Sequence, residues 1–284
     1  MTSTTSTRST LKVGAIITPR NQAELSQRVS AMQRAGYSFL QLNVVRPLDV
    51  DFIVAALAYC AEQGLPVEAI GCYANPMQPG SAMVSACSDD DLRALLEKLP
   101  PRGEDEDAYR VICWSGTLSG KLLLPHPGHN NPGAMAELRD WVKEIHPLLE
   151  RANACLLLHP HHAHVLGTHH SLHRFLMSLD TAYVGTVFDF CNWLSPKTFH
   201  ERDMILSEAL KKLAPMTGLV HVKDMRIDQF NLSVHVPGQG QLAFAGMLKQ
   251  FRRHVNDVPW IIDGAESEME LQRAREYLEM QARM

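Results

Sequence analysis

Apolar residues recur along the chain in two alternating patterns, short β-rich runs and longer segments with helical spacing. The first run covers residues 11–18, and in the following segment Leu25, Val29 and Met32 recur on one helix face. Asn21 precedes that segment where a helix N-cap is expected. Strand and helix patterns that alternate in this way indicate βαβ units and a parallel sheet.

Eight such units can be counted. Strands are predicted at residues 11–18, 38–45, 67–72, 109–114, 154–159, 183–189, 218–224 and 258–263. Helices are predicted near 49–64, 89–99, 170–179, 201–214 and 243–255, with one ending at Arg151 and one beginning at Ser267. We therefore expect a single (β/α)8 TIM barrel over residues 11–284, after a disordered polar tail at 1–10. A doubly wound sheet is the alternative, but GAIITPRNQ stands where a dinucleotide-binding sheet would carry G-x-G-x-x-G.

Two connections are unusually long and both follow strands. One, CYANPMQPGSAM, begins at Cys72, and the other runs over residues 116–132. Long loops at one end of a barrel commonly carry function, so we expect lids over a site there.

Composition describes a soluble protein that acts on small molecules. The chain has 284 residues, of which 45% are apolar and 20% charged, and neither a transmembrane run nor a secretory signal is found. We therefore expect a cytoplasmic protein without a membrane partner. A net charge of −4 gives no general attraction for nucleic acid. The six cysteines form no C-x-x-C pair and are expected to be buried reduced thiols, and a homo-oligomer is left open.

Four late strands end in side chains that bind metals. They are His159 (LLLH), Asp189 (TVFD), His221 (GLVH) and Asp263 (WIID). Strand C-termini of a barrel share one mouth, and a buried charge is costly unless it is paired or metallated. Taken singly, a strand-end aspartate is often a helix N-cap and a lone strand histidine is often a core residue. Four in succession favour one divalent metal with Mn, Zn, Co or Mg as candidates.

At this point the chain resembles the xylose-isomerase-like barrel superfamily, which includes the epimerases related to tagatose 3-epimerase, inosose dehydratases and endonuclease IV. The matching segments are LLLHPHHAHVLGT, VGTVFDFCNWL, HVKD, PGQGQLAFAGMLKQF and WIIDGAESEMELQRAREYL, with GCYANP and VICWSG earlier in the chain. The resemblance implies that His159, Asp189, His221 and Asp263 hold the metal. The family usually has glutamate at the first and last of these positions, where its epimerases keep their acid/base pair.

This departure changes the expected chemistry. A metal-bound neutral imidazole has no lone pair left to accept a proton, so two-base epimerisation is in doubt. Asp263 remains as a shorter base, Lys223 can stabilise an oxyanion, and His159 is kept as a catalytic candidate. Glu266, just after the last strand, is a further candidate for the missing glutamate, with a helix-N-terminal acid as the alternative.

The resemblance implies a substrate contact from Asn192, three residues after Asp189, where the family often has a substrate-binding Asn or His. A further contact is expected from His162 in a histidine-rich loop. That loop also offers His161 and His164 as bases. Trp114, Tyr73 and Trp193 are candidate apolar walls, with core packing as the equal alternative, and Asn75 is a weaker polar candidate.

The leading hypothesis is thus a metal-dependent isomerase or epimerase of a small polyhydroxylated keto compound. A lyase or dehydratase on the same scaffold is the close alternative. A third hypothesis is a non-catalytic protein, a sugar-binding barrel that has lost its acid/base glutamates. Endonuclease activity is disfavoured because it needs His, Asp and Glu from nearly every strand, whereas the first four strands end in apolar or neutral residues such as Thr18, Val45, Cys72 and Trp114. The acidic charge balance argues the same way.

Overall fold

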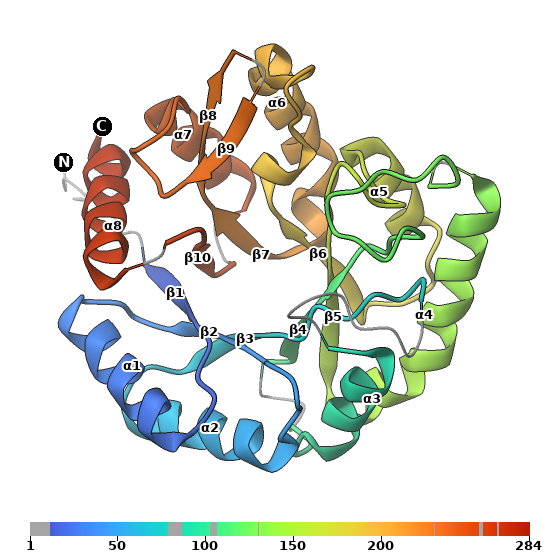
Figure 1. Ribbon diagram of the computed structural model, residues 1–284, viewed down its shortest axis with the longest axis vertical. Coiled ribbons are helices and arrows are strands. Elements are labelled where there is room, and N and C mark those ends of the chain that lie inside the picture. Colours follow the sequence, from blue (N-terminus) through green and yellow to red (C-terminus); the bar gives the residue numbers. More distant parts are fainter. Residues whose placement is uncertain are drawn as a thin grey trace, which may run out of the picture.

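The computed structural model describes residues 12–78, 87–102, 107–129, 131–229, 231–255, 258–265 and 267–284. In this part of the chain eight parallel strands close into a barrel, and helices surround it (Figure 1). The barrel strands are β1 (Val13–Ile17), β2 (Leu40–Asn43), β3 (Val67–Gly71), β4 (Tyr109–Trp114), β5 (Ala154–His159), β6 (Val184–Phe188), β7 (Thr217–Val222) and β10 (Trp260–Ile262). The ring closes where β1 pairs with β10, which confirms the predicted single (β/α)8 TIM barrel.

The helices lie where the hydrophobic periodicity predicts them. They are α1 (Gln22–Arg34), α2 (Val50–Glu62), α3 (Asp89–Lys98), α4 (Pro132–Ala152), α5 (His169–Met177), α6 (Arg202–Leu213), α7 (Phe244–His254) and α8 (Glu268–Arg283). Several begin at a side-chain cap: Asn21 accepts from the backbone N–H of Glu24, and Ser267 begins α8 as half of a capping box with Glu270. The first residue of each of these helices is therefore determined by a capping side chain next to it in the sequence.

A plug of apolar side chains fills the barrel interior below its mouth. Its members come from seven strands or strand approaches: Phe39, Ala69, Ile112, Leu157, Val187, Leu219 and Ile261. Glycines make room for the largest of them, because a Cβ on Gly14 would lie 2.4 Å from the Phe39 ring and one on Gly218 would lie 2.6 Å from Leu157. The barrel is thus a packed core rather than a pore.

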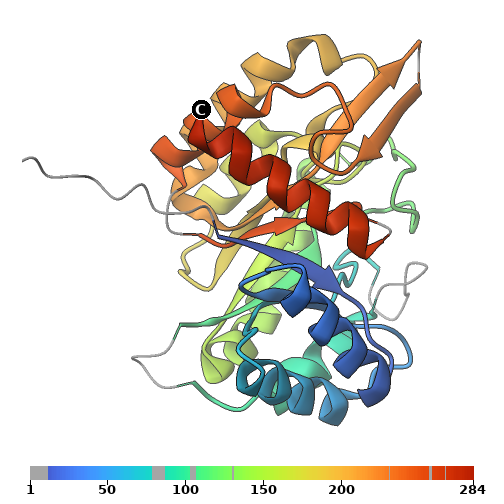
Figure 2. The ribbon, with the colours of Figure 1, turned by 90° about the vertical axis from the view of Figure 1, so that its left-hand side faces the viewer.

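A two-stranded hairpin, β8 (Asp224–Asp228) with β9 (Asn231–His235), interrupts the connection from β7 to α7, and the sequence analysis does not anticipate it. It projects from the barrel beyond β7 (Figure 2). Asp224, expected at the end of the seventh strand, instead begins this hairpin and accepts hydrogen bonds from the backbone N–H groups of Met225, Gly238, Gly240 and Leu242. The PGQG turn at residues 237–240 is therefore held by the Asp224 carboxylate.

The two long loops after β3 and β4 are tied to each other by a buried amide. The Asn75 side chain accepts from the backbone N–H of Thr117 and donates to the Thr117 carbonyl. Asn75 is therefore a loop clamp and not the polar substrate contact considered above. Residues 79–86 of the first loop, the predicted tail and Glu266 lie outside the described residues.

All six cysteines are free thiols, and five are buried while Cys155 is half-buried. No helix in the described ranges combines the length and the apolar character needed to cross a membrane.

Candidate metal centre and substrate cavity

The polar site lies directly above the apolar plug because strand side chains alternate between two faces. Residues two positions after plug members point into the same barrel interior, one step nearer the mouth. This layer comprises Gln41, Gly71, Trp114, His159, Asp189, His221 and Asp263, two positions after Phe39, Ala69, Ile112, Leu157, Val187, Leu219 and Ile261. Seven of the eight barrel strands, with their flanking residues, thus contribute an apolar residue to the plug and, two positions later, a residue to the layer above it, which is polar or aromatic in every case except Gly71.

His221 is held by a buried amide from the opposite side of the barrel. Its Nε2 lies 2.7 Å from Gln41 Oε1, while the Gln41 amide nitrogen is 2.9 Å from both Asn43 Oδ1 and the Tyr73 hydroxyl. Since the amide nitrogen faces these partners, the Gln41 oxygen is free to accept, and Nε2 of His221 must donate. The lone pair of His221 is therefore on Nδ1.

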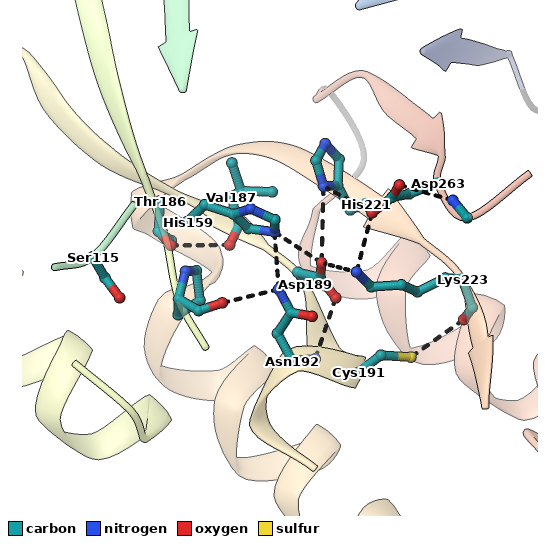
Figure 3. A network of polar contacts seen from close by, with 12 residues as sticks. Ser115, His159, Thr186, Val187, Asp189, Cys191, Asn192, His221, Lys223 and Asp263 are labelled. Atoms are coloured by element: carbon teal, nitrogen blue, oxygen red, sulfur yellow. Dashed lines mark hydrogen bonds and ion pairs between the residues drawn. The ribbon is translucent and has the colours of Figure 1, made fainter. Parts of the chain in front are cut away.

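That Nδ1 atom is buried and has no hydrogen-bond partner in the described structure. It lies 3.8 Å from Asp189 Oδ2 and 3.8 Å from Asp263 Oδ2 (Figure 3). Three electron-pair donors thus converge, and the two carboxylate oxygens among them already contact the ammonium of Lys223. A cation is the group that such an arrangement accommodates.

Lys223 supplies one positive charge to this cluster. Its Nζ lies 2.8 Å from Asp189 Oδ2 and 3.0 Å from Asp263 Oδ2. Burial alone would lower the pKa of Lys223, but the two carboxylates raise it well above its ordinary value. Burial likewise would raise the pKa of Asp189, yet Lys223 and the hydrogen bond from His159 hold it well below the ordinary range. Both carboxylates are therefore ionised and face the same space.

His159 contacts Asp189 through Nε2 at 2.8 Å, and Asn192 Nδ2 lies 3.1 Å from the same nitrogen. Burial lowers the pKa of His159 to about 4 despite the neighbouring carboxylate, so the imidazole is neutral near pH 7. Its Nδ1 is buried without a partner in the described residues. The ring is stacked on Trp114, with centroids 5.0 Å apart and an interplanar angle of 12°.

The donor set fits a divalent cation. His159, Asp189 and His221 each offer a ligand atom, and these atoms lie within 4.8 Å of one another. The unpartnered His221 Nδ1 is oriented by Gln41 as metal-ligating imidazoles usually are by a second hydrogen bond. Asp263, the fourth predicted ligand, does not belong to this group of three; its Oδ2 lies 3.8 Å from His221 Nδ1 and 3.0 Å from Lys223 Nζ, and its side chain is 26% exposed.

A cavity of about 700 Å³ opens above this cluster. Trp114 and Tyr73 line it, with ring centroids 4.9 Å apart, and so do Asn192 and Lys223. Trp193 is different, because it packs edge-on against Phe188 in the core and is not a cavity wall. Of the two roles considered for Trp193, cavity wall or core residue, the structure shows the core residue.

The histidine-rich loop brings His161 to the cavity rather than His162. His162 is exposed and is not among the residues that line the cavity, so the structure does not bring this predicted substrate contact to the cavity. His161 accepts from the Ala163 N–H at Nδ1, which places the ring proton on Nε2. Burial lowers the pKa of His161 to about 2, so this side chain is a neutral donor at the cavity wall and not a base.

His164, the third candidate base in this loop, is buried away from the cavity lining. Its Nδ1 lies 3.3 Å from Ser115 Oγ and its Nε2 3.2 Å from the Leu122 carbonyl. These contacts tie the loop after β5 to the loop after β4.

Gln41 and Asn43 are the functional residues that the sequence analysis misses. They alternate with Phe39 along β2, so the period-two pattern of this strand already placed them on the inner face. The strand-end search overlooked them because neither amide is itself a usual transition-metal ligand.

Comparison with known proteins agrees with this architecture. A family model described as xylose isomerase-like TIM barrel matches residues 29–281. A search of the curated proteins finds no significant match to this chain. Among solved structures, the chain is similar to 3-keto-D-glucoside 4-epimerase from E. coli, with a TM-score of 0.68 and 18% identity over 96% of this chain and 100% of the other.

Two further structures have the same fold. A xylose isomerase-like TIM barrel protein from Mycobacterium smegmatis, solved in complex with magnesium, gives a TM-score of 0.67 at 15% identity and covers 97% of each chain. The probable 3-DHS dehydratase AsbF from Bacillus anthracis gives 0.63 at 13% identity over 94% of this chain and 98% of the other. At these identities the likeness concerns the fold.

Proposed function

Since the chain belongs to the xylose isomerase-like TIM barrel family, we propose that it is a divalent-metal-dependent isomerase or epimerase of a small polyhydroxylated keto compound. The observation that carries this proposal is the convergence of His221 Nδ1, Asp189 Oδ2 and Asp263 Oδ2 below a cavity. Similarity to a sugar epimerase and to a magnesium-bound barrel supports the same assignment.

The proposed ligands are His159, Asp189, His221 and Asp263. A divalent cation bound there supplies Lewis-acid polarisation of a substrate carbonyl. Asp263, the most exposed of the four side chains, is the base that takes the proton from the adjacent carbon. It lies beside Lys223, whose ammonium stabilises negative charge that develops on the substrate oxygen.

Other side chains orient the substrate. Asn192 is fixed by its contact with the Pro160 carbonyl, and the Nε2–H of His161 has no protein acceptor in the described residues. These two groups are suited to substrate hydroxyls. Tyr73 and Trp114 cover ring carbons as apolar walls.

A single carboxylate base favours isomerisation over inversion. Asp263 can remove a proton and return it to the neighbouring carbon on the same face, whereas inversion requires a second acid on the opposite face. At the position where the family usually has a glutamate, this chain has His159, which is neutral and in contact with Asp189. The second acid that inversion requires is therefore missing there. Aldose–ketose interconversion, in which the proton of the neighbouring hydroxyl also moves to the former carbonyl oxygen, is therefore the preferred reaction type.

A dehydratase is the second candidate, and Lys223 is the observation that favours it. An ammonium 3.0 Å from the base can donate its proton to a leaving hydroxyl, which then departs as water after the base has removed the proton on the next carbon. The similarity to a probable dehydratase supports this alternative.

The test is proton exchange in D₂O with Mn²⁺, Zn²⁺ or Co²⁺ and a panel of ketoses, aldoses and keto acids. We expect deuterium at one carbon, loss of exchange in Asp263→Asn, and wild-type exchange in the surface control Asp140→Asn. Loss of water from the substrate identifies the dehydratase. Substrate binding without exchange under any metal identifies the non-catalytic binding barrel and refutes the enzyme assignment.

A further inference from the structure

The cavity lining combines polar and aliphatic side chains. His159, Lys223 and Asp263 lie at the metal centre, Thr18 and the exposed Lys121 also contribute, and five aliphatic residues outside the barrel strands make up a further part of the lining. The aliphatic residues are Val44, Val45, Leu122, Leu123 and Val234. They come from the loop after β2, the loop after β4 and the β8–β9 hairpin, three segments that are distant in sequence.

Two of these aliphatic side chains are unusually exposed. Leu123 is 68% and Val234 is 48% exposed, although both line the cavity. Scattered exposed apolar residues need no explanation, but apolar groups gathered at the mouth of a polar site indicate an apolar partner. Leu124, the next residue, is 50% exposed and lies outside the cavity lining.

The hairpin holds Val234 close to the catalytic end of β10. A Cβ on Gly264, which follows Asp263, would lie 3.3 Å from Val234 Cγ1. Gly264 has φ +85°, a conformation that favours glycine, so this close approach is compatible with the backbone there. The apolar mouth and the proposed base therefore belong to one continuous cavity.

The size of the cavity leaves room for more than an unsubstituted sugar. Its volume of about 700 Å³ falls in the range of roughly 300–1,000 Å³ that is typical of pockets for drug-sized ligands. A polyhydroxylated ring bound at the metal centre would leave the aliphatic side chains in contact with water. Binding would then gain no hydrophobic stabilisation from that surface.

We infer that the substrate is amphipathic, with a polyhydroxylated keto head at the metal centre and an alkyl or aryl substituent against Leu123 and Val234; this inference rests on the proposed function. The substituent, rather than a second copy of the chain, is the occupant because the aliphatic surface lines the catalytic cavity itself. A protein seated there would close the route by which any substrate enters.

The experiment compares D-fructose with 6-O-benzyl-D-fructose in the presence of Mn²⁺. Binding is measured by calorimetry and by the fluorescence of Trp114, which lines the cavity. We expect the benzyl compound to bind at least about tenfold more tightly, because an aryl group buries apolar area on two aliphatic side chains. This preference disappears in the double variant Leu123→Ser, Val234→Ser and persists in Leu124→Ser.

Equal affinity for the two ketoses, or no binding of the benzyl compound at millimolar concentration, overturns the inference. A double variant that keeps the benzyl preference but changes from dimer to monomer in light scattering also overturns it, since the surface is then a subunit interface. Binding requires no turnover, so these outcomes are read independently of the D₂O exchange that tests the proposed function.

Discussion

His221 Nε2 donates to Gln41 Oε1 at 2.7 Å across the barrel, from β7 to β2. The two residues are 180 positions apart in sequence. This one hydrogen bond decides which nitrogen of His221 can bind a cation, because it commits Nε2 to the proton and leaves Nδ1 facing Asp189 and Asp263.

Gln41→Leu is expected to weaken Mn²⁺ binding by about tenfold or more, as outer hydrogen-bond partners of metal ligands commonly do. The leucine keeps the volume but removes the acceptor that orients His221. Calorimetric titration with Mn²⁺ measures the effect, and Gln41→Glu, which retains an acceptor, is the control. Unchanged affinity in the leucine variant would show that the imidazole needs no orientation from Gln41.

Lys223→Met is expected to tighten Mn²⁺ binding while it lowers turnover. The ammonium lies within 3.0 Å of both Asp189 and Asp263 and repels a second cation, so its removal should raise affinity by at least about tenfold. The same titration measures this. Lys223→Arg keeps the charge and should show no gain; a weaker affinity in the methionine variant would contradict competition between the two cations.

His159→Glu is expected to add a carboxylate at the position where the family usually has one. We expect tighter Mn²⁺ binding and, because a second base becomes available, inversion at the exchanging carbon. NMR of the product in D₂O distinguishes the epimer from the isomer. His159→Gln is the neutral control, and the absence of any epimer from the glutamate variant would show that position 159 does not face the reacting carbon.

Stability is expected to fall as the pH is lowered from 6.5. The folded-state pKa of His164 is lowered to about 3 by burial, so the folded protein keeps it neutral while the unfolded chain binds its proton near the ordinary value of 6.5. Between these pH values the unfolded state holds more protons, and the free energy of unfolding decreases with falling pH by up to about 1.4 kcal/mol per pH unit for each such histidine.

His164→Gln should lower the slope of the free energy of unfolding against pH by the equivalent of roughly one proton. Urea unfolding between pH 4.5 and 7 measures this slope. Above pH 6.5, where His164 is mainly neutral in both the folded and the unfolded state, the slopes of the wild type and the variant should become equal. An unchanged slope in the variant would mean that His164 titrates equally in both states. Gln is chosen because its amide can replace the donor to Leu122.

Asp224→Ala is expected to destabilise the protein by about 3 kcal/mol or more, because it leaves four backbone N–H groups at the hairpin base without their acceptor. Thermal and urea unfolding measure the loss. Asp224→Asn keeps one acceptor oxygen and should lose less. A loss below about 1 kcal/mol in the alanine variant would show that water replaces the carboxylate.

Local patterns predicted most of the fold. The alternation of strands and helices gave the eight barrel strands, and Asn21 and Ser267 marked helix starts that the structure confirms. The sequence analysis did not predict the β8–β9 hairpin. Its two short strands follow β7 directly, so their residues resemble an irregular connection to α7. At the base of the hairpin Asp224 accepts hydrogen bonds from a turn 14 to 18 residues away, a contact that no local pattern shows.

The sequence by itself determined which strand ends bear His159, Asp189, His221 and Asp263, because chain order and the pleat place strand C-termini at one mouth. Only the tertiary structure decided that Lys223 bridges two of these residues, that Gln41 fixes a tautomer, and that His161 rather than His162 faces the cavity. Such choices depend on hydrogen bonds between residues that meet only after the barrel closes, so periodicity, which acts within one element, carries no information about them.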